Sequence, residues 1–156
     1  MPKYPIHGSP YFDVREFVDE RTWKMYGVRS AWFVEERTVR IADLVRKKSN
    51  AVTIINNWFF ADPGEHIFDS SGFRAPWDKE GGLLSQHRRG CADDLKVKGF
   101  KPKHVFELVM DNEIEFKEVG LTTMESIKIT VSWNHLDCRP FIPGVHPEKG
   151  FLIVKP

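Results

Sequence analysis

The segment 85–94, which reads SQHRRGCADD, constrains the fold of this chain more than any other stretch. Its His87 and Asp94 are too far apart to share one turn of a helix, so a common site requires the chain between them to reverse direction. Gly90 lies between them and supplies the permissive backbone conformation that a reversal needs. The following residues, 91–98, alternate in the manner of a strand. The sequence therefore predicts a tight turn that joins a loop histidine to a strand carboxylate.

The candidate ligands for a metal ion at this turn are His87, Asp94 and a third residue, His135, which lies in the later segment SWNHLDCR. Zinc binds nitrogen and oxygen donors, and its catalytic sites commonly use three protein ligands and leave one position for water. Two histidines and one carboxylate leave the ion with a net positive charge, which helps it to acidify that water. Ala92 shares the strand face of Asp94, and its small side chain leaves room beside a metal. We therefore predict one Zn²⁺ site in a small α+β frame.

The wider pattern resembles the zinc D-alanyl-D-alanine carboxypeptidase family of murein peptidases. Residues 85–94 match its S-x-H-x-x-G-x-A-x-D signature at every fixed position. Upstream, residues 71–74 (SGFR) resemble its S-G-[FY]-R segment, and two glycines at 81–82 precede the zinc motif. Downstream, residues 133–137 (WNHLD) resemble its final W/F-x-H-x-D segment. The order and spacing agree over about residues 11–140, and the H-x-D ending is closest to phage and bacterial members.

The resemblance implies an α+β, Hedgehog/D-Ala-D-Ala-peptidase-like fold, with a small antiparallel sheet and helices packed on one side. It implies a zinc metallopeptidase that hydrolyses peptidoglycan stem peptides, as a carboxypeptidase or as an L,D- or D,D-endopeptidase. Arg74 would polarise the scissile carbonyl and stabilise the oxyanion, since a guanidinium stays charged and offers several donors. Ser85 would donate to a substrate oxygen. The structural alternatives are an ordinary surface arginine and a turn serine.

The residue that accepts a proton from the attacking water has two candidates. Some members of the family carry an acid or a histidine two or three residues before the last zinc histidine, where this chain has Ser132 and Trp133. Asp137 shares the strand face of His135, and we favour it as the catalytic carboxylate. Its alternative role is to orient His135 from behind. Glu125 is the other candidate for the base, provided that a hairpin brings it to the site.

The whole chain, residues 1–156, is predicted to form one domain, because its length suits a single core. Apolar spacing, caps and β-branched runs indicate the secondary structure. We expect helices over 14–23 (capped by Asp13), 35–49 and 101–111, strands over 51–60 and 91–98, a β-hairpin of 116–124 and 127–137 with Glu125 and Ser126 near its turn, and a last strand in the tail FLIVKP.

Two cysteines and two tryptophans lie near the motifs. Cys91 and Cys138 are expected to be buried free thiols, with a disulfide or zinc ligation as alternatives. The strand alternation argues against ligation by Cys91, because it points away from Asp94. Trp77 and Trp133 are candidates for lining a substrate cleft, and core packing is the alternative.

The composition of the chain excludes few classes of protein. The net charge of +1 gives no argument for a nucleic-acid or membrane partner, and no apolar run approaches the roughly 20 residues of a membrane span. The segment MPKYPIHGSPYF lacks the regions of a signal peptide. We therefore expect a monomer that is made in the cytoplasm and acts at the cell wall after separate delivery, or as part of a phage particle. Two alternatives stay open: a non-catalytic zinc-binding or virion-associated structural protein that retains the peptidase fold, and a zinc hydrolase of another amide.

Overall fold

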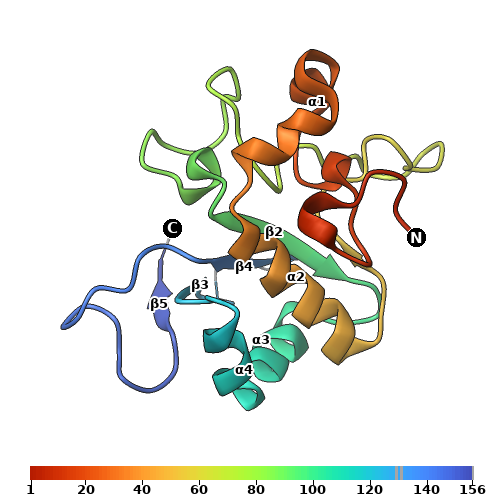
Figure 1. The fold of residues 1–156 in the computed structure, drawn as a ribbon. Coiled ribbons are helices and arrows are strands. Elements are labelled where there is room, and N and C mark those ends of the chain that lie inside the picture. The colour runs from red at the N-terminus through yellow and green to blue at the C-terminus, as the bar shows by residue number, and fades with distance from the viewer. Residues whose placement is uncertain (129, 131, 156) are drawn as a thin grey trace.

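The computed structural model describes residues 1–128, 130 and 132–155. It is an α+β fold with one five-stranded mixed sheet (Figure 1). The sheet order is β1-β2-β4-β3-β5. Its strands are β1 (Thr53–Ile54), β2 (Ala92–Val97), β3 (Thr123–Glu125), β4 (Asn134–Asp137) and β5 (Leu152–Val154). The α+β class is therefore confirmed. The predicted antiparallel sheet is wrong in one place, because β5 pairs parallel to β3. The reason is the long connection 138–151, which leaves the sheet and returns alongside β3 (Figure 1).

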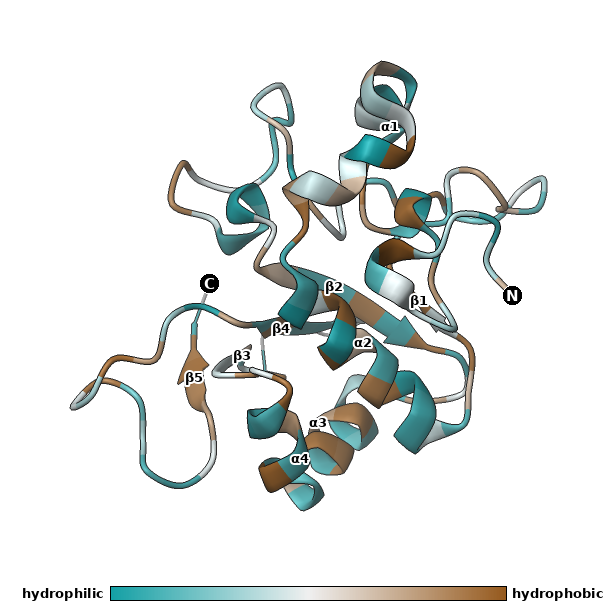
Figure 2. Cartoon of the chain, in the orientation of Figure 1, coloured by the Kyte–Doolittle hydropathy of each residue, from teal (hydrophilic) through white to brown (hydrophobic). Residues whose placement is uncertain are grey.

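Two helices cover one face of this sheet, as predicted. Helix α2 (Glu36–Ser49) contacts β2 and β4, and helix α3 (Pro102–Asp111) packs against α2 and β4. Pro102 occupies the start of α3, where its missing N–H costs nothing. Hydrophobic and hydrophilic residues alternate around α2 (Figure 2). The buried side chains of α2 are Thr38, Val39, Ile41, Ala42, Leu44 and Val45.

The N-terminal region departs from the predicted helix over 14–23. Asp13 is a cap, as expected, but it caps only a short 3₁₀ turn, Val14–Glu16. Helix α1 (Glu20–Tyr26) begins separately, because the Asp19 side chain accepts a backbone N–H of its first turn. Two competing caps six residues apart therefore divide the segment into two short elements.

The predicted strand 51–60 shrinks to β1 because two asparagines redirect the backbone that follows it. The Asn56 side chain donates to the Val18 carbonyl at 3.2 Å. The Asn57 side chain accepts the N–H of Phe68 at 2.6 Å. Side-chain hydrogen bonds of this kind compete with a sheet ladder.

The predicted hairpin is partly confirmed. Strands β3 and β4 are consecutive and pair antiparallel, but residues 116–118 of the predicted strand 116–124 belong to helix α4 (Glu113–Glu118). Glu125 lies at the end of β3 rather than in a turn. Residues 129 and 131 of the second predicted strand lie outside the described residues. The expected last strand is β5.

The main core lies between the sheet and its helices. It contains large, fully buried side chains from most elements, among them Phe12, Phe17, Ile41, Leu95, Phe116, Met124 and Leu136.

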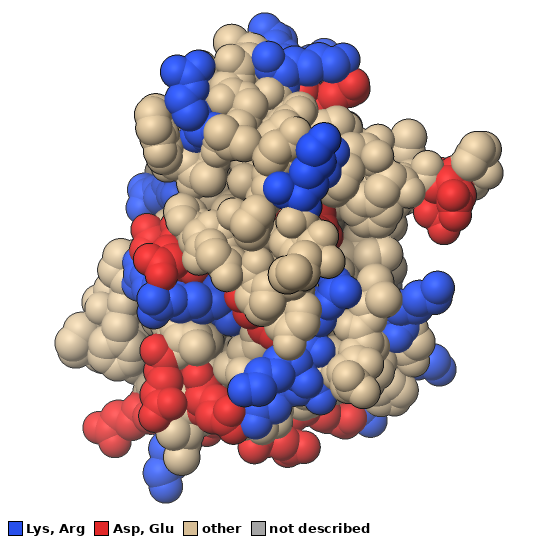
Figure 3. Space-filling model, turned by 45° about the vertical axis from the view of Figure 1, so that its right-hand side comes forward, with Lys and Arg blue, Asp and Glu red and all other residues tan. Residues whose placement is uncertain are grey.

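None of the helices in the described part of the chain is long and apolar enough to cross a membrane. Basic and acidic groups are interspersed between broad uncharged areas on the face shown in Figure 3. The free face of the sheet, opposite α2 and α3, carries the polar residues of interest.

Candidate metal centre

A straight row of side chains crosses four strands on the free face of the sheet. Asp94 of β2 is directly opposite His135 of β4. The β3–β4 register pairs Met124 with Leu136, so the next pair brings Glu125 opposite His135. Glu125 is in turn paired with Val154 of β5. The order along the row is therefore carboxylate, imidazole, carboxylate and valine, with neighbours about 5 Å apart.

His87 approaches this row from a short 3₁₀ turn, Gln86–Arg89, which Gly90 ends. Gly90 has φ +67°, the left-handed conformation that the sequence predicted there. A Cβ atom on Gly90 would lie 2.0 Å from the backbone oxygen of Phe33. The Gly90 carbonyl accepts hydrogen bonds from the Glu35 N–H at 3.0 Å and from the Thr38 hydroxyl at 2.9 Å. The reversal is thus tied directly to the start of α2.

The segment 71–74, SGFR, forms hydrogen bonds to both ends of the 85–94 motif. The Ser71 carbonyl accepts the Asp94 N–H at 2.7 Å, and the Arg74 N–H donates to the His87 carbonyl at 3.2 Å. Gly72 allows a close approach, because a Cβ on it would lie 2.4 Å from the Phe17 oxygen. Because both hydrogen bonds use backbone atoms, only Gly72 is required here for its residue type, since a side chain would meet the Phe17 backbone.

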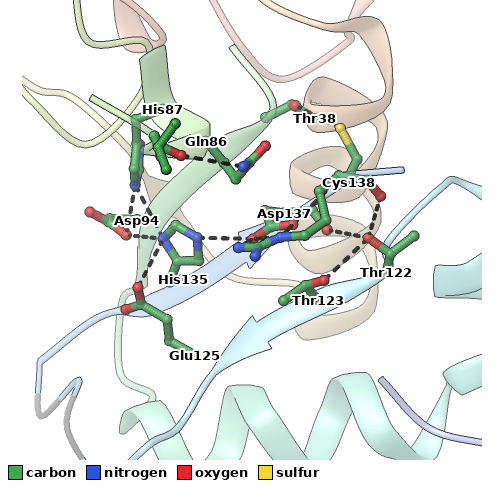
Figure 4. A network of polar contacts seen from close by, with 12 residues as sticks. Thr38, Gln86, His87, Asp94, Thr122, Thr123, Glu125, His135, Asp137 and Cys138 are labelled. Carbon is green, nitrogen blue, oxygen red and sulfur yellow. Dashed lines mark hydrogen bonds and ion pairs between the residues drawn. The ribbon is translucent and has the colours of Figure 1, made fainter. Parts of the chain in front are cut away.

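Three ligand-type atoms meet above the sheet (Figure 4). Suitable atoms of His87, Asp94 and His135 all lie within 4.8 Å of one another, and the three residues are buried. His135 Nδ1 lies 2.9 Å from Asp94 Oδ1 and 3.1 Å from His87 Nε2. The three predicted ligands are therefore brought together in an arrangement compatible with a metal site.

The outer contacts of both histidines decide which nitrogen faces the centre. His87 Nδ1 lies 2.8 Å from the Gly72 carbonyl, which only accepts, so Nδ1 carries the proton and Nε2 presents a lone pair. His135 Nε2 lies 3.3 Å from Asp137 Oδ2, so the neutral ring presents its Nδ1 lone pair. With Asp94 Oδ1, three acceptors then converge with no donor among them. Three converging lone pairs suit a divalent cation. Without a cation, one of these atoms must bind a proton to relieve the repulsion between them.

The charges of the centre follow from the same contacts. Burial opposes ionisation of Asp94, but its contacts with the His135 and His87 rings outweigh burial and lower the pKa of Asp94. Burial also disfavours the charged form of His135, yet hydrogen bonds to Asp137 and Asp94 raise the pKa of His135 to about 10. Arg74 Nη2 donates to Asp94 Oδ2 at 2.9 Å, so the second carboxylate oxygen is also paired.

The contacts of Asp137 place it behind His135, which favours the alternative role given for this residue. Its carboxylate is fully buried, forms an ion pair with Arg139 and touches His135 on the side away from Asp94 (Figure 4). It does not line the cavity next to the centre. A carboxylate in this position orients the imidazole, which is the alternative role that the sequence left open. Sequence reasoning missed Arg139, although it follows Asp137 by only two residues.

A cavity of about 650 Å³ opens beside the three ligands. Its lining includes Glu125, whose Oε1 is 3.9 Å from His135 Nδ1, together with Arg74, Ser85 and Trp133. Glu125 is therefore the carboxylate that reaches both the cavity and the centre. Trp77 does not line this cavity; its ring packs under the Arg21 guanidinium, 4.5 Å away. Of the two candidate aromatic residues, Trp133 alone faces the cavity.

Lys96 supports the centre from the same strand face as Asp94. Its Nζ donates to Ser71 Oγ at 2.7 Å and to the Asp94 carbonyl at 3.1 Å. Burial lowers the pKa of Lys96 to about 8. The strand alternation placed Lys96 on this face, but its bond to Ser71 depends on tertiary packing.

Comparisons with protein-family models, with curated proteins and with solved structures found no match for this chain.

Proposed function

We propose that this chain is a zinc-dependent peptidase of the D-alanyl-D-alanine carboxypeptidase and murein endopeptidase type, with a Hedgehog-like arrangement of its site. The observation that carries the proposal is the buried group of His87, Asp94 and His135, whose lone pairs converge beside an open cavity. The segments that carry the resemblance, 71–74, 85–94 and 133–137, also meet at this group, as a shared function requires. The substrate class, peptidoglycan stem peptides, is supported by the motifs alone.

His87, Asp94 and His135 would hold the ion. A zinc ion bound there supplies Lewis acidity and makes a coordinated water more acidic. Glu125 takes the role of general base, because its carboxylate reaches the cavity 3.9 Å from His135 Nδ1. The same group then delivers the proton to the leaving amine. Ser132 and Trp133 occupy the positions where part of the family carries an acid, so β3 supplies this function in place of β4.

Arg74 is held beside the ligands by two contacts. Its Nε donates to the Ser70 carbonyl at 2.7 Å and its Nη2 to Asp94. No hydrogen-bond partner of Nη1 is found among the described residues, and Arg74 lines the cavity. This nitrogen is suited to donate to a scissile carbonyl as negative charge develops on it. Ser85 also lines the cavity and would donate to a second substrate oxygen.

Three proteins test the proposal together: wild type, His87→Ala and Glu125→Gln. Each is analysed for zinc content and then incubated with purified peptidoglycan, and released peptides are measured. We expect one zinc per wild-type chain, with loss of both zinc and release in His87→Ala. Glu125→Gln should keep the zinc and lose about 100-fold or more in rate.

Other outcomes separate the alternatives. Zinc binding without release by wild type would favour the non-catalytic, zinc-binding or virion-associated protein. Release from other amides but not from peptidoglycan would favour a different zinc hydrolase. A folded wild type that takes up no supplied zinc would refute the metal site itself.

A further inference from the structure

The two cysteines of the chain lie opposite each other at one end of the β2–β4 pair. Ala92 is paired with Asp137, and the next pair in this register is Cys91 with Cys138. The Cys138 N–H donates to the Cys91 carbonyl at 2.9 Å, which extends the pairing to these residues. Both are free thiols in the structure, and Cys138 is buried, but Cys91 is only half-buried, which differs from the expectation that both are buried. Strand alternation places them on the face opposite the candidate metal ligands, which argues against zinc ligation by either.

The backbone geometry already suits a disulfide. Directly opposed residues of antiparallel strands have Cα atoms about 4.5–5.5 Å apart. Disulfides join Cα atoms about 4.4–6.8 Å apart, so the pair requires little backbone movement. Cys138 is fully buried, with its sulfur 3.4 Å from the Thr38 hydroxyl of α2. Cys91 is half-buried and can be reached from solvent.

The two thiols also differ in reactivity. The neighbouring Cys138 thiol lowers the pKa of Cys91 to about 7. The same contact and burial raise the pKa of Cys138. Cys91 is therefore both the accessible sulfur and the one that carries more thiolate at neutral pH.

We propose that Cys91 and Cys138 form an oxidisable pair that small disulfides such as oxidised glutathione convert into a cross-strand disulfide. The Cys91 thiolate attacks one sulfur of the reagent, forms a mixed disulfide and releases one glutathione thiolate. Cys138 then loses its proton and attacks the Cys91 sulfur, which releases the second glutathione. Two protein thiols and one reagent disulfide thus become one protein disulfide and two glutathione molecules.

The product fastens together the strands that carry two of the candidate ligands. Cys91 lies three residues before Asp94, and Cys138 lies three residues after His135. The bond closes a loop that includes α3, α4 and β3, so it restricts the unfolded chain strongly. Oxidation should therefore stabilise the β2–β4 pair at the edge of the metal centre.

The test treats the reduced protein with oxidised glutathione, alkylates the remaining thiols in denaturant so that the buried Cys138 is also reached, and measures the intact mass. We expect a monomer with no alkylatable thiol and no bound glutathione. Its melting temperature should rise by roughly 10 °C, and dithiothreitol should reverse the rise. Cys91→Ser is the matched control, and its remaining thiol should stay alkylatable with no thermal shift.

Three results would overturn the proposal. The first is a stable glutathione adduct on Cys91 with Cys138 still free. The second is two free thiols after treatment of wild type, and the third is a disulfide between chains. These readouts need neither metal nor substrate, so they stay separate from the fate of the proposed peptidase activity.

Discussion

Uptake of zinc should release a proton from His135, and this release measures how the centre is built. His135 lies between Asp94 Oδ1 at 2.9 Å and Asp137 Oδ2 at 3.3 Å. Hydrogen bonds to these carboxylates outweigh burial and raise its pKa to about 10. At neutral pH both ring nitrogens therefore carry protons. A metal ion must displace the proton on Nδ1 before it can bind there.

The magnitude follows from the distance between the working pH and this pKa. At pH 7 the gap is about three units, which makes zinc binding about 1,000-fold weaker than to the deprotonated site, or about 4 kcal/mol. Affinity should therefore rise about tenfold for each pH unit up to about 10. The metal-free protein should behave in the opposite way. The raised pKa contributes stability fully below the ordinary histidine pKa of about 6.5, and this contribution is lost as pH rises through about 10.

The assay is calorimetric titration of metal-free protein with zinc at pH 8, in buffers of different ionisation enthalpy. The dependence of the observed heat on the buffer gives the number of protons released, which we expect to be at least one per zinc. At this pH an ordinary histidine is already neutral, so the protons come from a perturbed group or from zinc-bound water, and a variant of Asp137 separates these two sources. Asp137→Asn is the control, because it removes one carboxylate and should reduce the release. Tight zinc binding with no proton release in wild type would refute this account of His135.

Three further predictions concern stability. Gly90→Ala should destabilise the protein by at least about 2 kcal/mol in urea unfolding and weaken zinc binding, because φ is +67° and a Cβ would meet a backbone oxygen at 2.0 Å. The control is Gly82→Ala, which should be nearly neutral because a Cβ there would have no atom within 4 Å. Equal losses of stability in the two variants would contradict this reasoning. Burial raises the pKa of Glu16 from 4.5 to about 7, so ionised Glu16 destabilises the fold; this destabilisation is absent below pH 4.5 and complete above pH 7. Glu16→Gln should therefore stabilise the protein by about 3 kcal/mol at pH 8 and by little at pH 4. Urea denaturation at both pH values measures this difference. Arg139→Gln should lower the unfolding free energy by about 3 kcal/mol, because it removes one of the two cationic partners of the buried Asp137 carboxylate and leaves it with His135. An unchanged urea midpoint would argue against this pairing.

Local sequence patterns predicted the parts of the centre that depend on one segment. The turn at Gly90 follows from a glycine between two ligand-type residues, and the face of Asp94 follows from the two-residue period of a strand. The helix over 35–49 and the start of the next helix at Pro102 follow from apolar spacing and from proline chemistry in the same way. Each of these features involves neighbours in the chain, so the residues themselves carry the information.

Where local signals compete, the sequence was a poorer guide. Asp13 and Asp19 are both good caps, and the pattern over 14–23 did not reveal that each would begin its own element. The segment 116–124 is predicted to be a strand, yet its first residues join α4. Packing against the core decides such cases, because short helices and strands differ little in intrinsic free energy.

The identity of the cavity carboxylate was decided only by the tertiary structure. Strand alternation showed that Asp137 shares a face with His135, but it does not show which residue of another strand lies opposite. The β3–β4 register brings Glu125 beside His135, and the Arg139 contact holds Asp137 behind it. Sequence alone thus determined which residues are candidate ligands and how the chain reverses between them. The pairing of strands distant in sequence determined which acid faces the cavity, because register is set by side-chain packing across the whole sheet.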